Sequence, residues 1–179
     1  QQTVEATILN DDDVMSIAAL DADRAEGSGS NTGFTFTVSR DGSLAGASTV
    51  GWRIVHSDTA ADDFAATTGV LEFADGEASQ LLTIDVIGDR DVEADEGFTV
   101  ELYDAGAGST IDAAASTANG VIRTDDVDLA ISAAAAVAAE GDETDAGVTS
   151  FTVTRSGDLS GVTTVDWQVE AASATASDF

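Results

Sequence analysis

Apolar and polar residues alternate in short runs along most of the chain. Residues 34–39 alternate Phe, Phe and Val with Thr and Ser, and residues 50–54 repeat the pattern around Trp52. A period of two is typical of a half-buried strand. Seven runs between Val14 and Asp126 fit it, namely residues 14–19, 34–39, 50–54, 70–73, 82–86, 98–102 and 117–122. Together they predict an all-β, antiparallel β-sandwich.

The remaining segments are less regular. We expect a short strand at residues 3–8 and a Gly/Ala/Ser loop at residues 103–116. Residues 133–139 are rich in alanine, which would suit a helix. Their place in the internal repeat favours a strand followed by a loop.

Parts of the sequence recur at a nearly constant distance. The Phe-Thr-Val at 36–38 returns at 151–153, and the Trp at 52 returns at 167, each offset by 115 residues. Ala-Glu-Gly at 25–27 returns at 139–141, offset by 114. Such recurrence predicts a tandem array. Residues 1–13 would be the last strand of one repeat, 14–126 a complete repeat, and 127–179 the first half of another.

The charge balance excludes several classes of partner. The 179 residues include 34 acids against six arginines and no lysine, for a net charge of −28. Nucleic acids and anionic membranes require clustered basic residues, so neither is an expected partner. No apolar run is long enough to span a bilayer, so membrane insertion is not expected. The chain has no cysteine and therefore no disulfide.

The turn between the runs at 82–86 and 98–102 concentrates acidic side chains. It carries five carboxylates: Asp89, Asp91, Glu93, Asp95 and Glu96. Ca²⁺ prefers six to eight oxygen ligands, many of them carboxylates. The turn therefore predicts a Ca²⁺ site, with a merely solvated acidic surface as the alternative. It is not an EF-hand, because Ala94 and Val100 stand where the loop glycine and bidentate glutamate belong.

Strand directions group further acids with this turn. In a seven-strand sandwich, the first, third and fifth connections lie at the end where the seventh strand exits. Those four places hold Glu26, Asp58, residues 89–96, and Asp125 with Asp126. The other connections, at 41–47, 74–79 and 104–116, carry few acids. The order of the strands thus predicts an acidic cluster at one end.

Several motifs together resemble the Calx-beta family. They include Ala-Glu-Gly at 25–27, Gly-Val-Leu-Glu-Phe-Ala-Asp-Gly at 69–76, Glu-Ala-Asp-Glu-Gly-Phe-Thr-Val at 93–100, and Asp125-Asp126. The resemblance implies an immunoglobulin-like sandwich of about seven strands with Ca²⁺ bound at one end. Carried over residue by residue, the implied ligands are Glu26, Asp58, Asp89, Glu93, Glu96, Asp125 and Asp126.

The sequence departs from the calcium-binding members of this family at three places. Gly88 stands where they often have an aspartate, and Arg90 lies inside the acidic turn. Both changes point to fewer bound ions. In the last segment Glu140 is kept, but Ser173 replaces the acid that corresponds to Asp58.

These features favour a Ca²⁺-rigidified structural repeat of a long extracellular or cell-surface protein, an adhesin or surface fibre. Its partners would be neighbouring repeats and cell-surface or matrix ligands. The alternatives are a carbohydrate- or ligand-binding module of a secreted enzyme, and a Ca²⁺-sensing domain of a transporter. Paired carboxylates can indicate a glycosidase, but these lie in turns of a small repeated module, so we expect no enzyme.

Trp52 and Trp167 alternate with apolar residues and are expected in the core rather than as sugar-stacking platforms.

Overall fold

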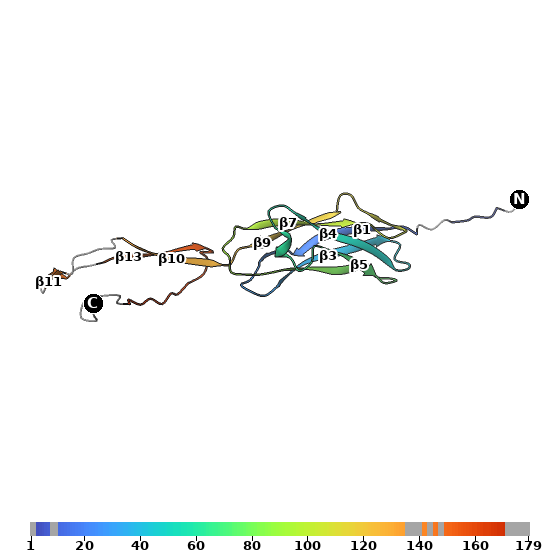
Figure 1. Ribbon diagram of the computed structural model, residues 1–179. Coiled ribbons are helices and arrows are strands. Elements are labelled where there is room, and N and C mark those ends of the chain that lie inside the picture. Colours follow the sequence, from blue (N-terminus) through green and yellow to red (C-terminus); the bar gives the residue numbers. More distant parts are fainter. Residues whose placement is uncertain (1–2, 8–10, 135–140, 143–144, 147–148, 171–179) are drawn as a thin grey trace. The chain divides into compact units, whose positions relative to one another are not determined.

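The computed structural model describes residues 3–7, 11–134, 141–142, 145–146 and 149–170. The chain forms two compact units, residues 1–125 and 126–179, which are described separately (Figure 1). Within the described residues, no helix is both long and apolar enough to cross a bilayer.

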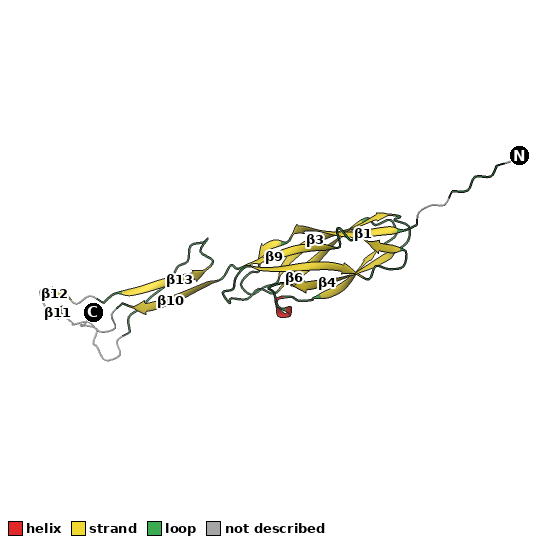
Figure 2. Ribbon diagram, turned by 90° about the horizontal axis from the view of Figure 1, so that it is seen from above, coloured by secondary structure: helices red, strands yellow, loops and turns green. Residues whose placement is uncertain are grey.

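The first unit is built from two sheets. The four-stranded sheet has the order β6-β3-β1-β8, with β1 at Asp13–Asp21, β3 at Thr32–Gly42, β6 at Ser79–Val86 and β8 at Ser109–Ile111. The five-stranded sheet has the order β2-β9-β7-β4-β5, with β2 at Asp23–Ala25, β4 at Ser48–His56, β5 at Thr68–Phe73, β7 at Glu96–Tyr103 and β9 at Thr117–Arg123. A single 3-10 turn among the described residues, η1 (Ala61–Asp63), follows β4 and is red in Figure 2. The predicted all-β sandwich is confirmed.

Aromatic side chains from both sheets fill the space between them. The Phe98 ring lies 5.8 Å from Phe34, 6.2 Å from Phe36 and 5.1 Å from Phe64, centroid to centroid, in edge-to-face contacts. All four rings are buried. Gly120 faces Phe98 across the β7–β9 pair, and a Cβ there would overlap the ring. Alternating residues of paired strands therefore make one continuous core.

A buried ion pair ties together the end of the sandwich where β1 begins. Arg40 and Asp13 are 2% and 3% exposed, and Arg40 Nε donates to Asp13 Oδ2 at 2.5 Å. The remaining guanidinium nitrogens donate to the carbonyls of Gly46, Ala45 and Ala74. Arg40 thus fixes the β3–β4 and β5–β6 connections to the start of β1.

Three segments of the first unit differ from expectation. The expected loop at 103–116 contains β8, and β2 lies outside the seven predicted runs. Both strands have three residues and pair in parallel, with β1 and β9, so alternation does not reveal them. The expected strand at residues 3–8 is wrong over 3–7, which pair with no strand among the described residues and leave Val4 91% exposed. An unpaired segment cannot form a sheet.

The second unit contains an antiparallel pair, β10 (Val127–Ala133) and β13 (Phe151–Gly157), and two-residue strands β11 (Gly141–Asp142) and β12 (Asp145–Ala146). Its register parallels that of β1 with β3: Val127 faces Gly157 as Asp13 faces Gly42. Arg155 Nη1 donates to the Gly161 carbonyl at 2.7 Å, as Arg40 Nη1 does to Gly46 at 3.0 Å. The tandem array and its boundaries stay a prediction.

Trp52 and Trp167 have different surroundings. Trp52 is 8% exposed and its indole lies over Gly69 of β5, as expected for a core residue. Trp167 is 79% exposed, and residues 162–170 form no strand, so the core position expected for Trp167 is wrong. In the first unit, the corresponding strand β4 lies between β5 and β7 and pairs with both. Residues 162–170 have no strand neighbour within the described part of the chain. Residues 135–140, including Glu140, and Ser173 lie outside the described residues.

Candidate metal centre

Four acidic segments meet at the end of the first unit from which β9 exits. The Gly27 amide donates to Asp125 Oδ1 at 3.1 Å, which joins the β2–β3 connection to the end of β9. The Asp58 amide donates to the Gly97 carbonyl at 3.4 Å, which joins the β4–β5 connection to β7. The backbone of Gly88 lies directly against Gly27. Loops from both sheets therefore present their carboxylates to a common region.

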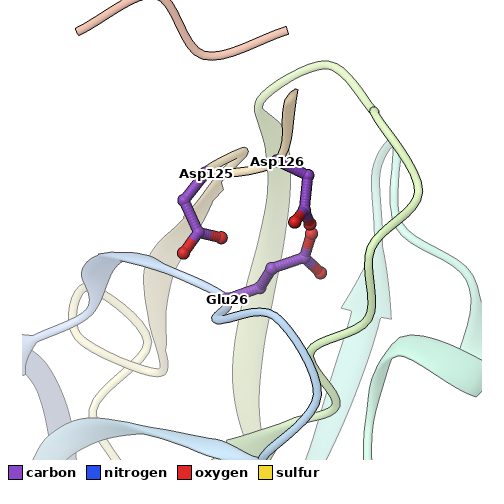
Figure 3. Close-up of side chains that lie close together, drawn as sticks. All are labelled: Glu26, Asp125 and Asp126. Carbon is purple, nitrogen blue, oxygen red and sulfur yellow. The ribbon is translucent and has the colours of Figure 1, made fainter. Parts of the chain in front are cut away.

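One group of acids comprises Glu26, Asp125 and Asp126, which we call the acidic trio. One carboxylate oxygen of each lies within 4.8 Å of the others, and Figure 3 shows the Glu26 and Asp126 carboxylates directed toward one another. Glu26 is 5% exposed and Asp126 is 6% exposed, while Asp125 is half-buried. Three carboxylates this close repel one another unless a cation or protons neutralise them.

Asp126 carries the clearest sign of a missing partner. Its Oδ2 atom is buried and accepts no hydrogen bond from any described residue. A buried neutral polar group without a hydrogen-bond partner costs about 1–3 kcal/mol. A buried charged oxygen without a partner costs more. A metal ion held by the acidic trio would satisfy this oxygen. The donor set, all carboxylate, suits a hard cation such as Ca²⁺.

A second group of acids surrounds the acidic turn, which we define as residues 87–95. Burial raises the pKa of Glu96, and the negative charges of Asp63, Glu93 and Asp58 raise it further. Asp63 also shares a hydrogen bond with Glu96. Like charges thus face one another from β7, the turn and the β4–β5 connection.

Glu93 belongs to the same group. Burial raises the pKa of its carboxyl, followed by the charges of Asp89, Asp63 and Asp91. The structure therefore places Asp89 near Glu93, and both Asp58 and Glu93 near Glu96. It brings Glu26, Asp125 and Asp126 together as the trio. Whether these seven residues bind metal stays a prediction.

Gly88 and Arg90, at which the acidic turn departs from calcium-binding family members, have different surroundings. A Cβ at Gly88 would overlap the Gly27 carbonyl oxygen and would lie 2.8 Å from the Glu26 carbonyl oxygen. Glycine is therefore required at 88 by the close approach of two backbones, and an aspartate would force them apart. Arg90 is exposed at the surface of the turn.

The residue-by-residue comparison with the family missed Asp63 as a site residue. Asp63 ends η1, and its carboxylate accepts from the Ala60 amide at 2.7 Å. That turn directs Asp63 toward Glu93 and Glu96, where its charge acts on both. Its position in the acidic loop Ser-Asp-Thr-Ala-Ala-Asp-Asp at 57–63 was the available signal.

Comparison with known proteins places this arrangement in a family. Residues 10–126 match the model of the Calx-beta domain. The chain belongs to the Calx-beta family. Calx-beta domains are calcium-binding, non-catalytic modules, and the matched residues include the whole first sandwich and both aspartates of the trio that follow β9. No curated protein matches the chain.

Solved Calx structures have similar folds. The apo-form Calx CBD1 domain is 25% identical with a TM-score of 0.54, over 64% of this chain and 98% of that domain. CBD12 from CALX1.2 is also 25% identical with a TM-score of 0.54, and the match covers 66% of this chain and 48% of that chain. The calcium binding domain CBD12 of CALX1.1 is 20% identical with a TM-score of 0.54, and the match covers 78% of this chain and 69% of that chain. At this identity the likeness shows the fold alone.

Proposed function

We propose that Ca²⁺ binds at the acidic end of the first sandwich, where the chain leaves β9. The observation that carries this proposal is the buried, unpartnered Oδ2 of Asp126 beside Glu26 and Asp125. The acidic trio would hold one ion. Asp58, Asp89, Glu93 and Glu96, together with Asp63, would supply ligands to a neighbouring position. The ion would replace repulsion between carboxylates by attraction to a common charge.

Calorimetric titration of the full chain with Ca²⁺, after removal of metal by a chelator, tests this proposal. Asp126→Asn removes one charge from the trio, and Asp41→Asn removes one from an exposed position at the opposite end of the sandwich. Ca²⁺ binding should release the same heat in the wild type and in Asp41→Asn. Asp126→Asn should lower affinity at least about tenfold, as loss of one ligand charge typically does. No heat from the wild type would refute Ca²⁺ binding.

Ca²⁺ should also raise the stability of the first unit. A ligand that binds only the folded state adds RT ln(1+[L]/Kd), about 2.7 kcal/mol at 100 times Kd. Melting curves in EDTA and in millimolar Ca²⁺ at fixed ionic strength measure this increment. Equal midpoints would contradict the proposal even if a weak heat were detected.

We further propose that the chain is a structural, non-catalytic repeat of a long extracellular or cell-surface protein, such as an adhesin or surface fibre. The sequence recurrence and the matching registers of β1–β3 and β10–β13 support it. Its partners would be neighbouring repeats and surface or matrix ligands, and the net charge of −28 disfavours nucleic acid. Treatment of intact cells from the native source with a nonspecific protease tests the location, and an intact-mass measurement on untreated cells tests the length. A protected, intracellular species near 18.1 kDa would refute the proposal.

The ion should also restrict the junction with the following segment. Asp125 and Asp126 directly precede Val127, the first residue of β10. A cation held by both aspartates would limit backbone rotation at that point. Small-angle scattering of the full chain should show a narrower distribution of lengths in Ca²⁺ than in EDTA. Unchanged dimensions would leave the ion with a role inside the first unit only.

A further inference from the structure

Arg123, near the end of β9, joins three segments at the margin of the acidic end. Its Nε and Nη2 atoms donate to the two carboxylate oxygens of Asp23 on β2, at 2.7 and 2.8 Å. Its Nη1 atom donates to Asp95 Oδ2 in the acidic turn at 2.6 Å. The Thr124 amide donates to Asp95 Oδ1 at 3.2 Å. We call this arrangement the Arg123 clamp.

The clamp gives Asp95 a different environment from its neighbours. Both oxygens of Asp95 accept hydrogen bonds, whereas Glu93 and Glu96 face other carboxylates. Asp95 lies between these two glutamates in the sequence, so its attachment to β9 determines where they can reach. Arg123 also lies two residues before Asp125, and therefore holds the turn at a fixed position relative to the trio.

The clamp is too exposed to act mainly through stability. The side chains of Arg123, Asp23 and Asp95 are 48%, 57% and 45% exposed. Exposed ion pairs contribute about 0–1 kcal/mol each. The geometry of the clamp is nevertheless specific, because a planar guanidinium binds one carboxylate through two parallel hydrogen bonds while it holds another.

We propose that Arg123 is a positioning residue for metal binding: it holds Asp95 out of the ligand set and fixes the acidic turn before the ion arrives. This inference rests on the proposed Ca²⁺ function. A turn that is already ordered loses less entropy when it binds, so affinity rises without any new contact to the ion. Outer hydrogen-bond partners of metal ligands typically change affinity about 10–100-fold.

The charge of Arg123 makes the proposal testable, because charge and position act in opposite directions. A cation near the site repels Ca²⁺, so a purely electrostatic role predicts that Arg123→Gln binds Ca²⁺ more tightly. The same role predicts no change for Arg123→Lys, which keeps the charge but loses the planar fork. A positioning role predicts weaker binding for both variants.

Ca²⁺ titration calorimetry and amide hydrogen exchange of the 179-residue chain test this proposal. Arg123→Lys and Arg123→Gln should bind Ca²⁺ about tenfold more weakly or worse. In EDTA, the amides of residues 89–96 should exchange faster than in wild type. Arg53→Lys is the matched control, because Arg53 forms an exposed pair with Glu101 on the same sheet at 2.8 Å. Its affinity and its exchange in the turn should equal those of wild type.

Two results would overturn the proposal that Arg123 positions the acidic turn for metal binding. The first is Ca²⁺ affinity in Arg123→Lys equal to wild type, or affinity in Arg123→Gln higher than wild type. The second is unchanged exchange of the acidic turn in EDTA, which needs no bound metal. Wild-type protein that takes up no Ca²⁺ refutes the proposed function instead, while the exchange measurement still decides whether Arg123 orders the turn. Melting midpoints in EDTA close to wild type establish that the variants are folded.

Discussion

Replacement of Asp13 by alanine should destabilise the first unit strongly without changing its response to Ca²⁺. Asp13 and Arg40 are buried at the end of the sandwich opposite the acidic trio. Arg40 cannot lose its charge, so removal of the carboxylate leaves a buried guanidinium without a counter-ion. Its hydrogen bonds to the carbonyls of Gly46, Ala45 and Ala74 remain.

These contacts set the magnitude. Breaking a buried ion pair by removing one partner costs about 3–5 kcal/mol. The three carbonyl acceptors of Arg40 compensate part of the loss, so we expect about 3 kcal/mol. That is a large share of the roughly 5–15 kcal/mol that stabilises a domain. At about 4 °C per kcal/mol, the melting midpoint should fall by about 12 °C.

Urea unfolding of the full chain in a Trp167→Phe background measures the effect, because Trp52 then reports on the first unit alone. The double variant Asp13→Val, Arg40→Met replaces the pair by apolar side chains and should recover most of the loss. Valine stands at the position corresponding to Asp13 in the second unit, where Val127 faces Gly157 and Arg155 Nε has no partner among the described residues. A cost below about 1 kcal/mol for Asp13→Ala, or no recovery in the double variant, would refute the reasoning.

Three other outcomes can be checked on the same material. In EDTA, stability should fall as pH rises above about 4.5, because folding raises the pKa of Glu93 and Glu96 and their contribution is lost as pH rises through the raised values. Urea midpoints at each pH measure this fall, and saturating Ca²⁺ should flatten the profile. Glu96→Gln should raise the EDTA midpoint but shrink the Ca²⁺ increment in melting curves. Gly88→Asp should lower stability by more than 1 kcal/mol and weaken Ca²⁺ binding, because its Cβ would overlap Gly27; tighter binding in calorimetry would show that the loops can separate.

The strands that line the core could be predicted from sequence because each buries one face. Residues 34–38 alternate buried and half-buried positions over the whole of the predicted run. The short strands β2 and β8 could not be predicted, since three residues show no clear period and their parallel partners are distant in sequence. Residues 165–169 carry the same alternation as β4 but form no strand. A pattern predicts a strand only where neighbouring strands are present to accept its hydrogen bonds.

The acidic end could be predicted in outline but not in detail. The order of strands grouped the right loops, because connections alternate between the two ends of a sandwich. It could not separate Asp95 from Glu93 and Glu96, three acids within four residues that have different partners. Nor could it include Asp63, whose direction depends on η1. These assignments depend on side-chain hydrogen bonds that no linear spacing encodes.

The two ends of the first unit satisfy their charges in opposite ways, and this difference indicates what the domain requires from its surroundings. At one end, Arg40 neutralises Asp13 within the protein. At the other, carboxylate oxygens of Glu26, Asp125 and Asp126 lie within 4.8 Å of one another, and Arg123 pairs with Asp23 and Asp95 at the margin. Folding therefore concentrates negative charge at this end of the sandwich. A cation from solution can balance it, so the stability of this end should follow the free Ca²⁺ concentration by mass action.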